Sequence, residues 1–119
     1  MRRVILESPF ASADPGDVSA NVAYARCCVR DSVIRGEAPI ASHLLFTQPG
    51  ILDDKIPEER QLGIAAGLAW LVHADAMVVY IDRGVSHGVQ EAMRAAQRMG
   101  VPVEMRSISI IEMPEETTT

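Results

Sequence analysis

The apolar run at residues 76–81 constrains the fold more than any other segment of this chain. Its sequence, Ala-Met-Val-Val-Tyr-Ile, is apolar at consecutive positions and rich in residues that favour strands. A strand of this composition has to be covered on both faces, which is typical of a central strand in a parallel sheet. The run therefore predicts a sheet with helices on each side.

Three further apolar runs, at residues 4–6, 38–41 and 101–105, predict the remaining strands. Helical segments separate them, so the order βαβαβαβ predicts an α/β fold with a mainly parallel sheet. At 119 residues the chain fits one domain. We assign that domain to residues 1–107 and a C-terminal tail to residues 108–119, and we expect the polar end of the tail, residues 114–119, to fray.

Three segments have the features of helices, at about residues 18–36, 57–73 and 88–99. Apolar side chains recur every three or four positions in the first, and Asp17 or Ser19 can cap it. The second begins with proline and two glutamates, which suit the first turn of a helix. A glycine follows the first and the third helix, as at many helix ends.

The second helix and the segment before it contain unusual residues. Gly63 and Gly67 lie about one turn apart, which predicts close packing of this helix on the sheet. We interpret Trp70 as a core residue rather than as a platform for a stacked base. Residues 47–57 contain two prolines, one glycine and two aspartates, so they predict a surface loop of a length that often covers a functional site.

The charge and the N-terminus limit the partners that we expect. A net charge of -5 gives no broad positive field for duplex nucleic acid or for an anionic membrane. The first apolar run stops at Glu7, which is too early for a secretion signal or a membrane span. These observations predict a cytoplasmic protein that binds neither a membrane nor duplex nucleic acid.

The cysteines and histidines predict no metal site and no cofactor. Cys27 and Cys28 are adjacent in a helix, so they point about 100° apart and are interpreted as buried thiols. No second pair of cysteines and no His-x-x-x-His spacing completes a set of metal ligands.

The loops that follow the strands predict where a ligand binds. The carboxyl ends of parallel strands lie along one edge of a sheet, which brings residues 7–10, 42–43 and 82–88 together. The last of these segments, Asp-Arg-Gly-Val-Ser-His-Gly, offers backbone amides, a hydroxyl and the positive end of a helix to a phosphate or a sugar. An ordinary helix cap at Ser86 is the alternative. The segment has neither a dinucleotide-binding fingerprint nor a P-loop.

Several side chains at this edge are candidates for chemistry. Glu91 falls in the first turn of the last helix near Asp82, and two carboxylates could divide nucleophilic and acid roles. Alternatively, Glu91 only complements the helix dipole. His43 could bind a ligand or cap the preceding strand, and Asn21 near the start of the first helix could reach a ligand above the first strand.

Four segments resemble the nucleoside 2-deoxyribosyltransferase-like superfamily, over about the first 106 residues. They are Leu-Glu-Ser-Pro-Phe at 6–10, Ala-Asp-Ala-Met-Val-Val-Tyr at 74–80, Ser-His-Gly-Val-Gln-Glu at 86–91 and Gly-Val-Pro-Val at 100–103. The whole chain resembles more closely a group of small uncharacterised phage and actinobacterial proteins. Three segments carry that closer resemblance, at residues 21–26, 36–43 and 59–64.

The superfamily resemblance implies a flavodoxin-like three-layer α/β/α fold, with a four- or five-stranded sheet, in a homo-oligomer. It also implies a small nucleoside or nucleotide-like ligand whose N-glycosidic bond is cleaved or exchanged. Glu91 would be the nucleophile and Asp82 the acid or a residue that orients the site. The predicted ligand-binding residues are Ser8, Pro9, Phe10, Asn21, His43, Gly84, Ser86, His87 and Gly88.

The sequence departs from the superfamily pattern at two places. Nucleotide-cleaving relatives have glutamate six residues after the serine, whereas this chain has Ala92 there and Glu91 one position earlier. One residue is a rotation of about 100° on a helix. The usual first-strand tyrosine is replaced by Leu6 or Phe10. Three functions stay open: an N-glycosidase or deoxyribosyltransferase, a non-catalytic nucleotide or ribose-phosphate binding protein that acts as a sensor or sponge, and an oligomeric scaffold.

Overall fold

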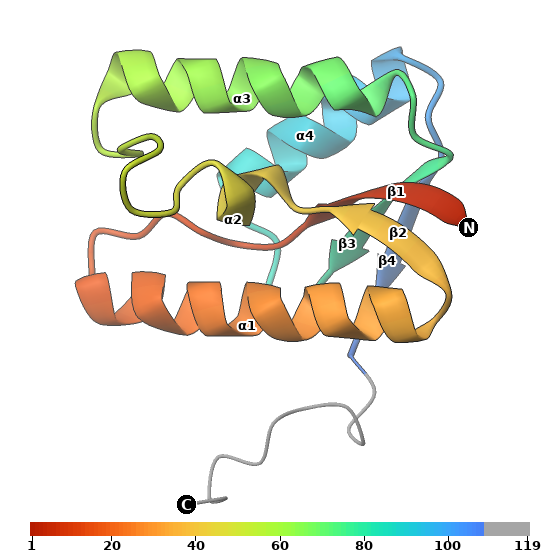
Figure 1. Ribbon diagram of the computed structural model, residues 1–119, viewed down its shortest axis with the longest axis horizontal. Coiled ribbons are helices and arrows are strands. Elements are labelled where there is room, and N and C mark those ends of the chain that lie inside the picture. The colour runs from red at the N-terminus through yellow and green to blue at the C-terminus, as the bar shows by residue number, and fades with distance from the viewer. Residues whose placement is uncertain (109–119) are drawn as a thin grey trace, which may run out of the picture.

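A computed structural model describes residues 1–108 as one sheet between helices (Figure 1). The elements in chain order are β1 (Arg2–Glu7), α1 (Pro15–Ile34), β2 (Glu37–Ile40), α2 (Ser42–Leu45), α3 (Pro57–Leu71), β3 (Ala76–Tyr80), α4 (His87–Arg98) and β4 (Val103–Arg106). Apart from Ile108, the C-terminal tail lies outside the described residues, and so do the residues that we expect to fray.

All four strands are parallel, in the order β2-β1-β3-β4. Ile5 of β1 pairs with Ile40 and Met77, its neighbours in β2 and β3. Met77 pairs in turn with Val103 of β4. This is the strand order of flavodoxin-like sheets. The predicted α/β fold with a mainly parallel sheet is therefore confirmed.

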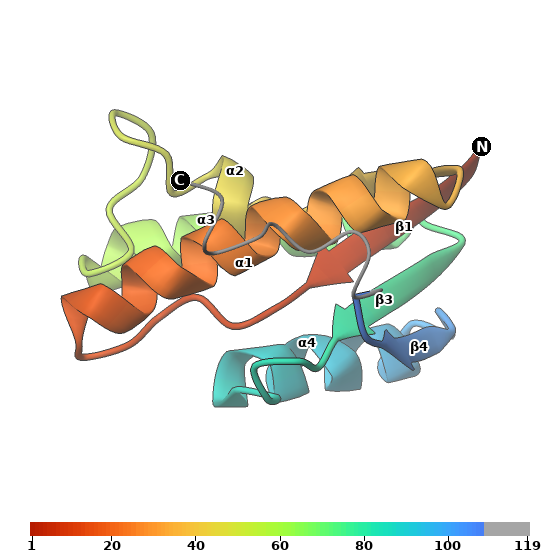
Figure 2. The same cartoon turned by 90° about the horizontal axis from the view of Figure 1, so that it is seen from below.

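Helices cover both faces of the sheet, and Figure 2 shows α1 and α4 on opposite sides of it. Core residues on the α1 face include Val4, Leu6, Tyr24, Cys28, Ala76, Val78 and Tyr80. Core residues on the α4 face include Ile5, Leu71, Met77, Val79, Val89, Ala95 and Ala96. All five residues of β3 are buried, as the apolar run predicts.

The first helix begins earlier than its apolar spacing predicts. Asp14 is the N-cap, and its side chain accepts a hydrogen bond of 2.9 Å from the backbone N–H of Gly16. Pro15 occupies the first helical position, where the missing N–H is no loss. The prediction that Asp17 or Ser19 caps this helix was wrong. Pro15 and Gly16 are residue types that are common in turns, so the sequence placed them before the helix, whereas they form its first turn.

The glycines of α3 face α2 and the preceding loop, so the prediction that they pack on the sheet was wrong. A Cβ atom on Gly67 would lie 2.6 Å from Ser42 Oγ, and one on Gly63 would lie 3.4 Å from a methyl carbon of Leu52. Leu71 is the buried residue of α3. Trp70 was predicted to be in the core but is 50% exposed, because its side chain lies away from the buried side of the helix.

An ionic cluster lies between the sheet and the second half of α1. Glu37 Oε1 accepts hydrogen bonds from Arg106 Nη1 at 2.8 Å and from the Ser32 hydroxyl at 2.8 Å. Tyr80 donates its hydroxyl hydrogen to Asp31, and the Arg106 guanidinium lies 5.6 Å from the centre of the Tyr80 ring. The hydrogen bonds from Arg106 hold the pKa of Glu37 at about 2. The cluster therefore joins α1 to strands from both edges of the sheet.

Replacing Glu37 by glutamine should lower the free energy of unfolding by about 3 kcal/mol near neutral pH, because Arg106 loses a buried charge partner. The pKa of Glu37 is about 2 in the folded protein and 4.5 ordinarily, so this stabilisation is present above about pH 4.5 and is lost as the pH falls towards 2. Urea denaturation across this range measures both effects.

Glu104→Gln is the matched control, since the Glu104 side chain is 41% exposed and that of Glu37 only 9%. Glu104→Gln should lower the free energy of unfolding by less than about 1 kcal/mol. Equal losses in the two variants would contradict a special role for the buried pair.

Candidate functional site

A cavity of about 560 Å³ lies at the carboxyl ends of β1 and β3, against α2, α3 and α4. We call it the inner cavity. Part of its polar lining comes from the three segments predicted at this edge, namely Glu7, Ser8, Ser42, His43, Ser86 and His87. The other polar lining residues are Thr47, Asp54, Glu59, Arg60, Glu91 and Arg98. Its apolar wall comes mainly from Phe10 and from α3, where Ile64 and Leu68 face it. The structure thus brings the predicted loops to one place.

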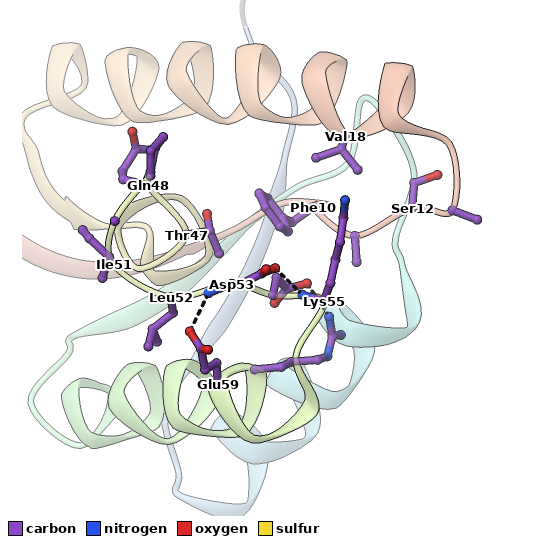
Figure 3. Close-up of a pocket in the computed structure, with 16 residues that line it drawn as sticks. Phe10, Ser12, Val18, Thr47, Gln48, Ile51, Leu52, Asp53, Lys55 and Glu59 are labelled. Carbon is purple, nitrogen blue, oxygen red and sulfur yellow. Dashed lines mark hydrogen bonds and ion pairs between the residues drawn. The ribbon is translucent and has the colours of Figure 1, made fainter.

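A second cavity, of about 810 Å³, lies between residues 10–13 and the loop at 47–55 (Figure 3). We call it the outer cavity. The residues in the walls of both cavities are Phe10, Ala11, Thr47, Leu52, Asp54, Glu59 and Arg60. The loop is held at its base, where the backbone N–H of Asp53 donates to Glu59 at 2.8 Å. The segment predicted to be a surface loop therefore borders the site.

Glu7 lies in a segment that the sequence predicts at this edge, but it was not among the predicted catalytic or ligand-binding residues. It ends β1 in register with Val79, on the same side of the strand as Ile5, and it lines the inner cavity. The cavity leaves part of Glu7 open, but the surrounding protein removes enough water to raise the pKa of its carboxyl to about 8. At neutral pH it is mainly protonated. A carboxyl at the end of a buried apolar strand was the signal that could have identified it.

Ser8 and His43 form a pair in the wall of the cavity. His43 Nε2 and Ser8 Oγ are 2.7 Å apart. Burial lowers the pKa of His43 to about 4, so the imidazole is neutral at neutral pH. The other ring nitrogen, Nδ1, is buried without a hydrogen-bond partner among residues 1–108. Such a buried polar atom without a partner is uncommon in folded proteins.

The start of α4 presents positive character to the same cavity. Ser86 is the N-cap, and its hydroxyl oxygen accepts a hydrogen bond of 3.2 Å from the backbone N–H of Val89. Ser86 therefore has the helix-cap role that the sequence left open as an alternative. Its O–H group can still donate a hydrogen bond to a ligand. Arg60 Nη2 would lie 3.9 Å from a Cβ on Gly88. The helix N-terminus and this guanidinium together favour an anion.

Glu91 lines the inner cavity but does not point freely into it. Its side chain is 53% exposed and pairs with Arg94, three residues further along the helix. His87 Nε2 lies 3.8 Å from the same carboxylate. Contact with a ligand would require the Glu91 carboxylate to turn away from Arg94.

Asp82 is not in the lining of the inner cavity, so the structure does not bring it together with Glu91. Its carboxylate faces α1, where it accepts hydrogen bonds from the Tyr24 hydroxyl and from the backbone N–H of Ile108 at 3.1 Å. Asn21 donates to the carbonyl oxygen of Phe10 at 3.0 Å. These contacts fix the loops at the carboxyl edge from the α1 side.

Two other predicted residues also lie outside the lining. Pro9 is buried beside Ser8. Gly84 is exposed in the turn after β3, where its φ of 86° favours glycine. Neither contacts the inner cavity, whereas Ser8, Phe10, His43, Ser86, His87 and Gly88 all line it.

Within residues 1–108, no three His, Cys, Asp or Glu side chains are placed to hold one metal ion. In that same part of the chain, no helix is long and apolar enough to cross a membrane. Cys27 and Cys28 are both free thiols, and Cys28 is buried.

Comparison with known proteins bears on the fold more than on the activity. The model of a family described as a domain of unknown function, DUF7768, matches residues 2–106. No curated protein matches the chain. A solved structure of a 2-deoxyribosyltransferase from the psychrotolerant bacterium Bacillus psychrosaccharolyticus is similar to it, with a TM-score of 0.59 and 22% identity, over 88% of this chain and 72% of that one. The predicted flavodoxin-like α/β fold is confirmed, and the closer likeness to phage and actinobacterial proteins stays a prediction.

Acid should destabilise the protein partly through His43. Its pKa is about 4 in the folded protein and 6.5 ordinarily, so its contribution to stability is present above about pH 6.5 and is lost as the pH falls towards 4. In His43→Gln, the decrease in the free energy of unfolding on acidification should be smaller by on the order of 1–3 kcal/mol. Urea denaturation at several pH values measures it.

The control is His73→Gln, because His73 is an exposed histidine just after α3. That variant should keep the acid dependence of the wild type. If His43→Gln keeps it too, the histidine is not desolvated in the folded protein.

Proposed function

Because the chain belongs to the DUF7768 family, which has no assigned activity, we propose from its own site that it binds a small nucleoside or nucleotide and cleaves or exchanges the N-glycosidic bond. One observation carries this proposal. A carboxylate on α4, a protonated carboxyl on β1 and the positive end of a helix line the same cavity. The fold shared with a 2-deoxyribosyltransferase supports it.

The phosphate or sugar of the ligand would bind at the start of α4. The Ser86 hydroxyl and the free backbone N–H groups of the first helical turn can donate hydrogen bonds there. The Arg60 guanidinium beside Gly88 adds a positive charge, although Asp54 Oδ2 holds it at 2.7 Å. A nucleoside or mononucleotide suits a cavity of about 560 Å³, which is in the usual range for small-molecule sites.

The nucleobase would bind towards α3 and the end of β1. Phe10, Ile64 and Leu68 give this part of the cavity an apolar surface for the faces of a planar ring. Ser8 and the neutral His43 give it hydrogen-bonding groups for the ring edges. An uncharged heterocycle fits these surroundings better than an ion does.

In the reaction, Glu91 would attack the anomeric carbon while the bond to the base breaks. Water or a second base would then take the sugar from Glu91, which gives hydrolysis or transfer. Asp82 orients the site instead of contacting the ligand, because its bonds to Tyr24 and Ile108 fix the end of β3. Pro9, Asn21 and Gly84 contribute through the shape of the same loops.

A specific observation favours the second candidate, a binding protein without catalysis. Glu91 is paired with Arg94 and is one helix position away from the glutamate of nucleotide-cleaving relatives. If the pair persists when a ligand binds, the cavity becomes that of a nucleotide sensor or sponge. Both candidates use the same ligand and the same cavity.

The proposal also includes a homo-oligomer in the cytoplasm. Leu62 and Trp70 of α3 and Val72, the residue directly after it, each expose at least half of their surface to solvent. Exposed apolar side chains grouped on one helix are typical of protein interfaces. A third candidate, an oligomeric scaffold, would use this surface without the chemistry of the inner cavity.

The test is incubation of the full chain with a panel of deoxynucleosides and their 5′-monophosphates, with free base measured by chromatography. The wild type should release base, and Glu91→Gln should reduce the rate by about 1000-fold or more, because it removes the nucleophile.

Glu58→Gln is the matched control, since Glu58 is exposed in the first turn of α3 and lines neither cavity. It should leave the rate unchanged. Thermal stabilisation by a panel member without release of base would assign the binding function in place of the enzyme. If no panel member stabilises the protein and none releases base, the result contradicts both candidate functions.

A further inference from the structure

We infer that Glu7 is a catalytic residue, the acid that gives a proton to the departing nucleobase. This inference rests on the proposed function and adds a residue to it. Glu7 lies at the carboxyl end of β1, on the face of the sheet that packs under α4. Its side chain lines the inner cavity together with Ser8, His43 and Glu91. An acid and a nucleophile therefore meet the same ligand.

The groups around Glu7 leave its carboxyl without a charge partner. The titratable and charged residues that line the inner cavity with it are His43 from α2, Asp54 from the loop, Glu59 and Arg60 from α3, and His87, Glu91 and Arg98 from α4. Arg60 is paired with Asp54, and Glu91 with Arg94. Among the described residues, none forms a hydrogen bond or ion pair with the Glu7 carboxyl, and desolvation alone raises its pKa. The protonated form is therefore favoured at neutral pH.

Asp82, the other acid predicted at this edge, is unsuited to this task. It is on the α1 side of the sheet, and its Oδ2 atom already accepts hydrogen bonds from Tyr24 and from the backbone of Ile108. A general acid has to come within hydrogen-bond distance of the atom that it protonates. Glu7 is in the wall of the ligand cavity and Asp82 is not.

The proton transfer balances over the two steps of the reaction. In the first, the bond between the anomeric carbon and the base breaks, the electron pair stays with the base, and a ring nitrogen takes the proton of Glu7. A Glu91 oxygen forms the new bond to the anomeric carbon. In the second step, water attacks that carbon and gives a proton to the Glu7 carboxylate, which restores the acid and frees Glu91. In transfer, the N–H group of an incoming base supplies this proton.

The experiment compares two leaving groups in the wild type and in Glu7→Gln. Each deoxynucleoside or deoxynucleotide that the wild type cleaves is paired with an analogue whose base leaves without a proton, the 7-methyl derivative for a purine and 5-nitrouracil for a pyrimidine. Glu7→Gln should lose about 100-fold or more on the ordinary substrate, the size expected for general acid catalysis. It should cleave the activated analogue within about threefold of the wild-type rate.

The pH dependence gives a second readout. For the wild type with the ordinary substrate, the rate should fall as the pH rises through about 8, because Glu7 loses its proton. This fall should be absent with the activated analogue. Glu7→Asp, which keeps a carboxyl group on a shorter side chain, should recover part of the loss. Circular dichroism and thermal unfolding establish that each variant is folded.

Asp82→Asn is the comparison variant, and it should change the rates on both leaving groups by the same factor. Equal losses on the two leaving groups in Glu7→Gln, or no loss on either, would overturn the inference, because Glu7 would then only shape the cavity. If the wild type releases no base from any substrate, the proposed function and this inference both fail. If the wild type is active and Glu7→Gln matches it, only the inference fails.

Discussion

The parallel pairing of β3 with β1 and β4 is the constraint on which the rest of the structure depends. Because β3 is buried at every position, both faces of the sheet need helices, and α1 and α4 supply them. Parallel pairing also places the ends of β1 and β3 at the same edge. Loops that are about 75 residues apart in the sequence therefore line one cavity. The packing of the core thus fixes the position of the site.

The same burial determines which groups in the cavity carry charge. Loss of water raises the pKa of Glu7 and lowers that of His43, so both are mainly neutral near neutral pH. Arg60 and Glu91, which also line the cavity, form ion pairs with Asp54 and Arg94. The cavity therefore combines neutral donors and acceptors with charged groups that can exchange partners. This division suits a ligand with an uncharged ring at one end and a polar or anionic group at the other.

The sequence predicts the parallel sheet and the loops at its edge, because these follow from runs of apolar residues and from the geometry of parallel strands. It does not predict α2, since four residues are too few to show a helical period. The sequence also does not show which of the residues at the carboxyl ends of the strands faces the cavity. In a strand that is apolar on both sides, alternation gives no distinction between the faces, so Asp82 was predicted as the acid and Glu7 was placed at this edge without a role. Only the three-dimensional packing of α1, α3 and α4 distinguishes them.

The carboxyl groups on the two faces of the sheet have different surroundings. On the α1 face, Asp31, Glu37 and Asp82 all accept hydrogen bonds from tyrosine or arginine side chains. These contacts join distant elements and so serve the fold. On the α4 face, Glu7 is desolvated without a partner, which lowers stability wherever the unfolded chain would be ionised. Protein interiors rarely keep such a group unless it has a role in binding or catalysis. The unpaired carboxyl, more than the paired ones, therefore marks the face where the chemistry should be sought.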